Sequence, residues 1–184
     1  LMGCKDSDAY LQASLYAYKL EPSADAAVGC AAMAFKKGDI DGSVKFFDEA
    51  INLETDNAKK ADNAYKAASV LASAKKLSQA RSYAQKAISF NENFGAPYIL
   101  IAQLYAGNYK WNDEPALNKC TFFAAIDKLQ RAKAVDPSVA EEANKLISSY
   151  SAYTPEAKDL FMLGYKAGDR ITIGGWIGET TTIR

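Results

Sequence analysis

The segment KKGDIDGSVKFFDEAINLETDN, residues 36–57, contains a turn followed by a helix with a defined order of small and large residues. Gly38 and Asp39 supply the turn, Phe47 is a large apolar residue, and Ala50 is a small residue close to the helix end. A single helix cannot bury an apolar stripe without a neighbour. The same order recurs along the chain, so this segment is one unit of a repeat.

Two later segments and one partial earlier segment repeat this order: AKKLSQARSYAQKAISFNEN (74–93), TFFAAIDKLQRAKAVDPS (121–138) and DSDAYLQASLYAYKLEPS (6–23). Small residues occupy matching positions in three complete units. They are Ala31, Ala68 and Ala102 in the first helices, Ser43, Ala80 and Ala125 where the second helices open, and Ala50, Ala87 and Ala132 where they close. Small side chains let helix backbones approach closely, so we expect each unit to stack on the next.

This register resembles the tetratricopeptide repeat, a helix-turn-helix unit of about 34 residues. The resemblance implies an all-α fold, namely a right-handed α-solenoid with a capping helix and a small C-terminal β-hairpin. We expect repeat units at about 1–23, 24–57, 61–94 and 95–138, capping helices at 139–168 and the hairpin at 169–184. In this register Leu1 to Lys5 fall in a turn between two helices, so further repeats are expected upstream.

The third complete unit departs from the pattern through an insertion of about eleven residues between its helices. The insertion lies around GNYKWNDEPALNKC, residues 107–120. Such a long connection inside a tight repeat is either functional or a local cap. Tyr109 and Trp111 within it are candidate contacts for a sugar or a peptide, or anchors that fix the loop to the helices.

The last residues, ITIGGWIGETTTIR (171–184), alternate in polarity and break with the helical pattern. Gly178 and Glu179 suit a two-residue hairpin turn, which would pair 171–177 with 180–184. An isolated hairpin is marginal in water, so Trp176 and Ile177 must pack on other elements. We expect a cap on the last helices or on the mouth of the groove. Alternatively, the outer strand serves as a dimerisation or β-augmentation element.

Helix boundaries follow from residues at the expected ends. Ser23 and Asp41 are predicted N-caps, because their side chains can accept hydrogen bonds from first-turn amides. Residues 138–153 carry an apolar helical stripe with two acids in the first turn, which predicts the capping helix. Pro155 then starts a short helix that Gly164 or Gly168 ends.

Composition excludes several classes of function. Lys plus Arg and Asp plus Glu each total 22, so the net charge is zero, which argues against nucleic acid as the main partner. The chain has no histidine, the commonest general base and metal ligand. Three scattered cysteines make neither a zinc site nor a disulfide framework. We therefore expect no enzyme activity, no metal, no cofactor and no transmembrane segment.

The tetratricopeptide resemblance implies that the first helices line a concave groove for a protein or peptide partner. The candidate groove residues, carried over by position, are Asp25, Phe35, Lys36, Asp62, Tyr65, Lys66, Ser69 and Gln103. Val28 and Ala32 occupy two places of the Lys and Asn pattern that clamps a carboxylate in co-chaperone repeats, so such a clamp is not expected. A non-catalytic interaction module is predicted, although the same positions also suit a solvated or tail-covered surface.

The C-terminal part resembles the end of a group of exported bacterial tetratricopeptide proteins, mostly of unassigned function. The likeness rests on an Asp-Lys, Ala-Lys and Val-Asp-Pro block and on Trp176, Ile177, Glu179, Thr180 and Arg184. It implies a location in the bacterial cell envelope, periplasmic or exported. Two further hypotheses stay open: a homodimer, and a regulatory domain of a larger envelope protein.

Overall fold

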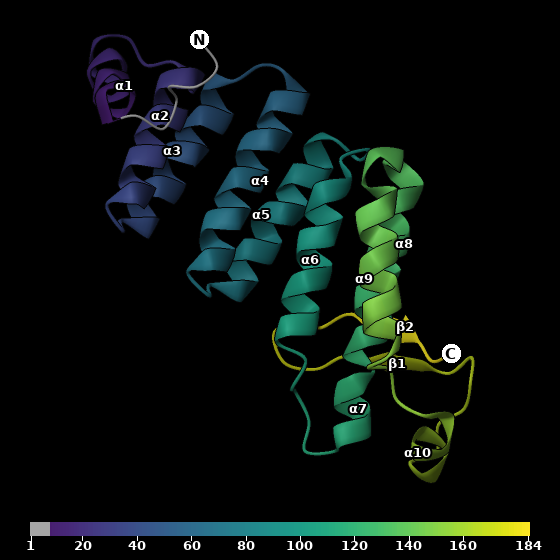
Figure 1. Cartoon of the computed structure of the whole chain (residues 1–184). Helices are drawn as coiled ribbons and strands as arrows, with labels where there is room; N and C mark the ends of the chain where they lie inside the picture. The colour runs from purple at the N-terminus through teal and green to yellow at the C-terminus, as the bar shows by residue number, and fades with distance from the viewer. Residues whose placement is uncertain (1–7) are drawn as a thin grey trace. The chain divides into compact units, whose positions relative to one another are not determined.

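The computed structural model describes residues 8–184 (Figure 1). The chain forms two compact units, Leu1–Asn91 and Glu92–Arg184. Each unit is described by itself. The predicted turn at Leu1 to Lys5 lies outside the described residues. The helices of the first unit are α1 (Asp8–Leu20), α2 (Ala24–Lys36), α3 (Ile40–Leu53), α4 (Asn57–Ser73) and α5 (Leu77–Phe90).

The second unit combines helices with the predicted hairpin. Its elements are α6 (Gly95–Gly107), α7 (Pro115–Lys119), α8 (Thr121–Val135), the 3₁₀ turn η1 (Pro137–Val139), α9 (Ala140–Ser151), α10 (Ala157–Met162), β1 (Arg170–Thr172) and β2 (Thr180–Thr182). The predicted all-α fold with a capping helix and a terminal hairpin is confirmed. Within the described residues, no helix is both long enough and apolar enough to span a bilayer.

The small residues that define the repeat are the most completely buried residues of both units. All nine alanine and serine positions aligned between the three complete units are 0% exposed. The two large residues of the second helices, Phe47 and Leu129, are also buried. A larger side chain at any of the nine positions would overfill the contact between helices. The sequence register therefore identified the packing surfaces of the helices.

Of the two predicted N-caps, one at the start of α2 is correct and one at the start of α3 is wrong. Ser23 caps α2 as expected, accepting a hydrogen bond from the Ala26 amide at 3.3 Å. Asp41 does not cap α3. The cap is Asp39, whose carboxylate accepts from the Gly42 amide at 2.9 Å. Gly38 turns the chain at a φ of 79°, and the residue directly after this turn becomes the N-cap.

The turn between α4 and α5 repeats this geometry without glycine. Lys75 lies at a φ of 59°, in the left-handed region that Gly38 occupies in the preceding unit. The Lys76 amide donates to the Leu71 carbonyl at 2.9 Å, as the Asp39 amide does to the Ala34 carbonyl at 2.9 Å. A left-handed conformation costs a non-glycine residue about 1–2 kcal/mol. Stacking of the flanking helices therefore imposes the turn on a residue that does not favour it.

Polar contacts join the second helices of successive repeats in the first unit. The Tyr83 hydroxyl of α5 donates to Asp48 of α3 at 2.5 Å, and Lys86 reaches the same carboxylate at 3.1 Å. Burial, and then this hydrogen bond, raise the pKa of Tyr83. Tyr18 of α1 makes the corresponding contact with Glu49 of α3. These bonds connect neighbouring repeats in addition to the contacts between small residues.

In the second unit, Asp136 fixes the end of α8 to the start of α6. Its carboxylate accepts hydrogen bonds from the Gly95 amide at 3.0 Å and from the Ser138 amide at 3.1 Å and hydroxyl at 2.5 Å. The Ser138 hydroxyl, followed by the Gly95 amide, lowers the pKa of Asp136. A β-carbon on Gly95 would lie 2.5 Å from a methyl group of Val139, so only glycine fits this approach.

The hairpin register differs from the sequence prediction. Ile171 pairs with Thr181 and Thr172 with Thr180, so residues 173–179 form the connection and no two-residue turn exists at Gly178 and Glu179. Gly175 and Gly178 adopt positive φ angles of 63° and 60°, which makes the longer loop possible. Ile173 and Ile177 within this connection are both buried.

The hairpin packs on the first half of α8 through one apolar face and a set of polar contacts (Figure 1). Ile171, Ile173, Ile177 and Ile183 are all buried. Asp127 of α8 accepts from the Thr181 hydroxyl at 2.6 Å and forms an ion pair with Arg184. Lys128 pairs with Glu179 at 2.8 Å. The prediction that the tail packs on helices is confirmed, and the main contact is α8.

The burial of Ile173 predicts a large effect of its truncation. Ile173→Ala should lower the free energy of unfolding by about 2–5 kcal/mol, because it leaves a cavity between hairpin and helices. Urea unfolding followed by tryptophan fluorescence measures it well, since both tryptophans of the chain, Trp111 and Trp176, lie at the hairpin. Thr182→Ala, at an exposed strand position, is the control. Equal effects of the two substitutions would contradict hairpin packing.

The contacts of Asp136 predict a pH dependence of stability. The pKa of Asp136 in the folded protein lies below its ordinary value of 3.8. The contribution of Asp136 to the free energy of unfolding is therefore complete above pH 3.8 and is lost as the pH falls through the lower folded pKa. Asp136→Ala should be less stable near neutral pH and should lose less stability on acidification. The stability of Ser138→Ala, which keeps the hydrogen bond between Asp136 and the Gly95 amide, should lie between those of the wild type and Asp136→Ala. Parallel stability curves of wild type and Asp136→Ala between pH 7 and 2 would refute the assignment.

Candidate functional site

The first unit contains a cavity of about 420 Å³ between its helices, lined mostly by charged and small residues. The lining residues are Asp25, Val28, Gly29 and Ala32 of α2, Phe47 of α3, Glu54, and Lys59, Asp62, Asn63 and Lys66 of α4. We call this the charged cavity. Its walls come mainly from two first helices: α4 carries polar residues one turn apart, and α2 contributes Asp25 and three small or apolar residues.

Four of the five charges in the charged cavity are internally paired. Lys66 binds Asp62 at 2.5 Å, and Lys59 lies 3.8 Å from Glu54. Glu54 also accepts from the backbone amides of Asp56 and Thr55, which together lower its pKa. Asp25 is exposed in the first turn of α2, and among the described contacts it is the carboxylate of the cavity that no cavity lysine pairs with. The cavity therefore presents one carboxylate at its surface beside two ion pairs.

Apolar and amide groups complete the charged cavity. Phe47 is 5% exposed and packs with Ala31, Ala67 and Val70 in the core, so it forms a rigid floor. Asn63 is also 5% exposed, and its amide lies on the cavity wall. An asparagine amide both donates and accepts hydrogen bonds, as a peptide group does. The cavity can therefore bind a cation, a main-chain amide and a small apolar group together.

The structure brings together only part of the predicted groove set. Asp25, Asp62 and Lys66 line the charged cavity, whereas Phe35, Lys36, Tyr65 and Ser69 do not. Tyr65 packs on a cluster of Ile51, Ala64 and Ala87, and the Ser69 hydroxyl donates to the Tyr65 carbonyl at 3.0 Å. Phe35 and Lys36 are exposed in the last turn of α2. Gln103 belongs to a different cavity in the second unit.

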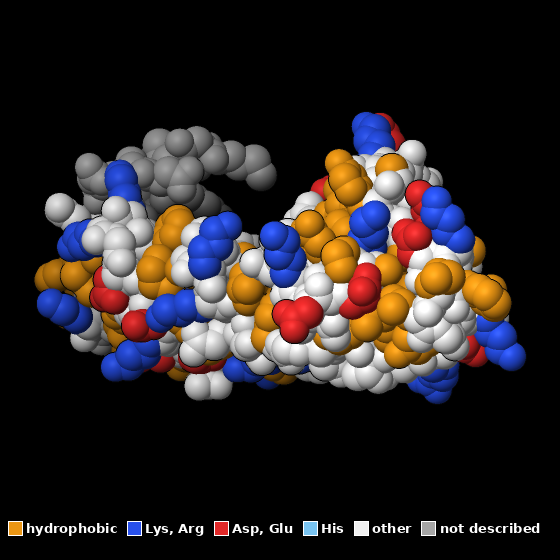
Figure 2. Space-filling model, turned by 90° about the horizontal axis from the view of Figure 1, so that it is seen from below, with side chains coloured by type: hydrophobic (Ala, Val, Ile, Leu, Met, Phe, Trp, Pro, Cys, Tyr) orange, Lys and Arg blue, Asp and Glu red, His pale blue; other side chains and the backbone are white. Residues whose placement is uncertain are grey.

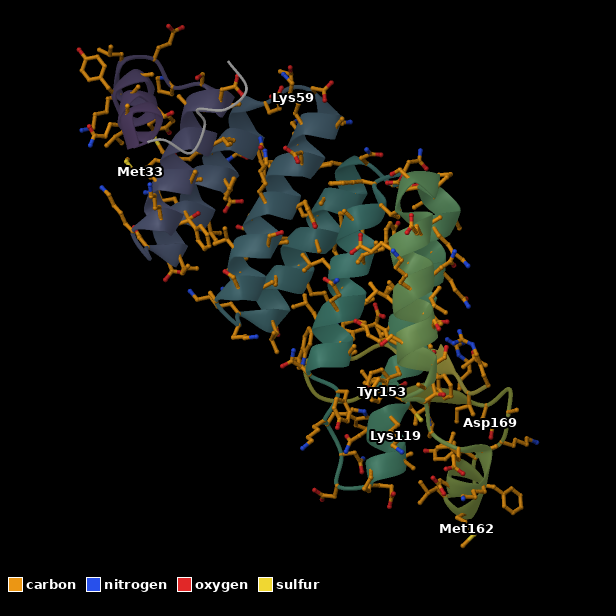
Figure 3. The ribbon with its side chains drawn as sticks, viewed as in Figure 1. Met33, Lys59, Lys119, Tyr153, Met162 and Asp169 are labelled. Atoms are coloured by element: carbon orange, nitrogen blue, oxygen red, sulfur yellow. The ribbon has the colours of Figure 1, made fainter. Side chains whose placement is uncertain are left out.

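That second cavity has a volume of about 450 Å³ and is lined mainly by aromatic rings. The lining residues are Gln103, Ala106 and Gly107 of α6, Tyr109, Lys119 of α7, Phe122 of α8, Tyr150 of α9, and Tyr153. We call this the aromatic cavity. Phe122 lies at its centre, with ring centroids 5.4 Å from Tyr109 and Tyr153 and 5.9 Å from Tyr150. Figure 3 shows Lys119 and Tyr153 close together below α9.

The insertion of residues 107–120 builds one wall of the aromatic cavity. Asn118, which is buried, accepts from the Trp111 amide at 2.7 Å and the Asn112 amide at 2.8 Å, and donates to the Asn112 carbonyl at 2.7 Å. The Thr121 hydroxyl donates to the Tyr109 carbonyl at 3.2 Å. These bonds hold the loop against α8, so Tyr109 is fixed beside Phe122.

Three predicted loop and tail candidates lie outside both cavities. The Trp111 ring would lie 2.6 Å from a β-carbon at Gly174, so the two segments are in close contact. Trp176 packs edge-on against Tyr105 of α6 with ring centroids 5.6 Å apart, and Ile177 is buried. In the described part of the chain, the buried Trp111 indole nitrogen has no hydrogen-bond partner. These side chains join the hairpin to the insertion and α6.

Most residues that line the two cavities were not among the predicted site residues. Tyr150 and Tyr153 lie in the segment 138–153 that is predicted to form the capping helix, and Lys119 lies in the insertion, but the sequence pattern assigns no binding role to them or to Phe122. Tyr150 and Tyr153 are three residues apart, which would place both on one helix face, and this spacing was the available signal. Asn63 has no such signal, because its position relative to Asp25 depends on packing of α2 against its neighbours.

The hydrogen bonds of Asn118 predict that the insertion depends on this side chain. Asn118→Ala should lower the free energy of unfolding by about 1–3 kcal/mol, because two partly buried amides and one carbonyl lose their hydrogen-bond partner. Hydrogen exchange of the Trp111 and Asn112 amides should accelerate. Asn112→Ala is the control, because it keeps all three bonds of Asn118 and removes only an exposed side chain that accepts from the Glu114 amide. Unchanged exchange at Trp111 in Asn118→Ala would disprove this role.

Comparison with known proteins supports the fold alone. No family model matches the chain, and no curated protein matches it. A crystal structure of MamA matches with a TM-score of 0.57 at 20% identity, covering 76% of this chain and 68% of that one. A second MamA structure matches with a TM-score of 0.55 at 15% identity, covering 84% and 86%. MamA contains tetratricopeptide repeats, and this chain has the same class of α-solenoid fold.

Proposed function

We propose that this chain is a non-catalytic interaction module that binds a segment of a partner protein in the charged cavity. The observation that carries the proposal is the exposed carboxylate of Asp25 on the wall of a cavity that also holds the buried amide of Asn63 and the apolar floor at Phe47. Three residues selected from sequence as groove positions, Asp25, Asp62 and Lys66, line this one cavity. The tetratricopeptide fold class supports a protein partner.

The chemistry of the charged cavity favours a segment with a basic side chain. Asp62 and Glu54 already have lysine partners, so an incoming lysine or arginine pairs best with Asp25. The Asn63 amide can hydrogen-bond the main chain of an extended segment, and Val28 and Ala32 leave room for a small apolar side chain. Such a combination of one charge pair with main-chain bonds gives orientation as well as affinity.

The hairpin as a dimerisation or β-augmentation element stays a prediction. Its apolar face packs on α8 and its two paired strands have only three residues each. A short strand offers few free backbone groups for pairing with another chain. The charged cavity is therefore the better-supported candidate for partner binding.

A peptide selection tests the proposed function. A phage-displayed random peptide library selected on the wild-type protein should yield sequences enriched in Lys or Arg. Asp25→Asn should weaken binding of the selected peptides about tenfold, which corresponds to about 1.4 kcal/mol for one charge-assisted bond. Calorimetric titration gives these affinities, and circular dichroism checks folding.

The matched control is Glu21→Gln, which removes an exposed acid that lies just before α2 and outside the charged cavity. It should leave the affinity unchanged. Selected peptides without basic residues, or equal losses in Asp25→Asn and Glu21→Gln, would count against the proposal.

A further inference from the structure

We infer that the aromatic cavity is a second binding site, which takes an aromatic side chain next to a carboxylate group in a segment of a partner protein. This site lies within the second unit and does not depend on the charged cavity of the first. Its position follows from the insertion of residues 107–120, which closes one side of the space between α6 and the end of α9.

The rings of the aromatic cavity are arranged to receive another ring. Tyr153 stacks on Phe122 with an interplanar angle of 26°, whereas Tyr109 and Tyr150 are tilted against it by 39° and 59°. Aromatic pairs favour offset stacked or edge-on contacts, and these differently tilted faces offer both kinds. Phe122 is buried, whereas Tyr153 is 58% exposed at the cavity edge. A guest ring would cover part of that exposed surface.

Every polar side chain that lines the aromatic cavity can donate a hydrogen bond. The donors comprise the hydroxyls of Tyr109, Tyr150 and Tyr153, the amide of Gln103 and the ammonium of Lys119, and no carboxylate lines the cavity. Burial raises the pKa of Tyr150, so its hydroxyl stays protonated and able to donate. Hydroxyl and ammonium donors favour an anionic acceptor. The charged cavity, with three carboxylates, has the opposite preference.

The positive charge of Lys119 favours a ligand with a carboxylate over a ligand with a cationic group. Ring faces attract cations, but an ammonium group already on the wall repels a second one. In the described part of the chain, Lys119 makes no ion pair. The positive charge of Lys119 contributes to lowering the pKa of Glu156, but the ion-pair partner of Glu156 is Lys158, at 2.9 Å. Lys119 is therefore available to a carboxylate, such as an Asp or Glu side chain beside the guest ring.

The surface around the aromatic cavity is accessible from outside. Figure 2 shows hydrophobic side chains on the outer surface of the second unit, interspersed with lysines and acids. Gly107, the last residue of α6, lies on the cavity wall, and a β-carbon built there meets nothing within 4 Å. This glycine has no positive φ, so a side chain can be added without backbone strain. Gly107→Leu therefore adds a bulky side chain at the cavity wall and should not unfold the protein.

The test uses blocked peptides as probes. Acetyl-Gly-Glu-Phe-Gly-amide, acetyl-Gly-Lys-Phe-Gly-amide and acetyl-Gly-Glu-Ala-Gly-amide are titrated into the whole chain, and binding is followed by saturation-transfer NMR and by shifts of the tyrosine ring signals. The Glu-Phe peptide should bind saturably and at least about tenfold more tightly than the other two. Gly107→Leu and Lys119→Met should each reduce its affinity about tenfold or more.

Lys110→Met is the matched control, because Lys110 is exposed in the same loop but does not line the cavity. It should bind the Glu-Phe peptide as the wild type does. Thermal melts verify that the variants fold. Absence of saturable binding, or equal affinities of wild type and Gly107→Leu, would overturn the inference. Binding of free 3-phenylpropionate without binding of the peptide would also overturn it, because the guest would then be a small carboxylic acid.

The two proposals fail independently. Asp25→Asn should leave Glu-Phe binding unchanged, and Gly107→Leu should leave binding of basic peptides to the charged cavity unchanged. Loss of both activities in either variant would indicate a single shared site and contradict the assignment of two.

Discussion

The close approach of helices at small residues is the constraint on which both units depend. At the aligned positions, such as Ala31, Ser43 and Ala50, no side chain is accessible to water. Interiors pack near crystal density, so the space between two such helices admits no larger group. Stability then comes from contacts between neighbouring helices, and stretches of helix between these contacts are free to carry other residues. Both cavities are lined mainly by residues that lie outside the nine small-residue positions.

Because packing is specified so tightly, it overrides local preferences elsewhere. Lys75 adopts a left-handed turn that Gly38 adopts without strain, since the helices on either side require the same angle. The hairpin likewise has no two-residue turn at Gly178 and Glu179, and its longer connection contains the buried Ile173 and Ile177. At Lys75 the energy of apolar burial exceeds a local cost of about one or two kcal/mol.

The two cavities differ in chemistry because they arise in different ways. The charged cavity lies along the repeats themselves, where α4 presents polar residues at helical spacing and α2 adds Asp25, and ion pairs join four of its five charged side chains. The aromatic cavity exists because an insertion interrupts the repeat and is fixed by Asn118 and Thr121. An array with two such surfaces can bind two segments of different charge.

The sequence by itself determined the helices, the repeat register and the buried small residues, since periodicity and residue size act locally and repeat along the chain. It also predicted that Asp25, Asp62 and Lys66 share a surface, because a first helix recurs at each repeat. Only the tertiary structure decided that Tyr65 packs in the core, that Asp39 rather than Asp41 caps α3, and that Phe122, Tyr150 and Tyr153 surround one space. Those outcomes depend on contacts between distant segments, whose geometry no local pattern encodes.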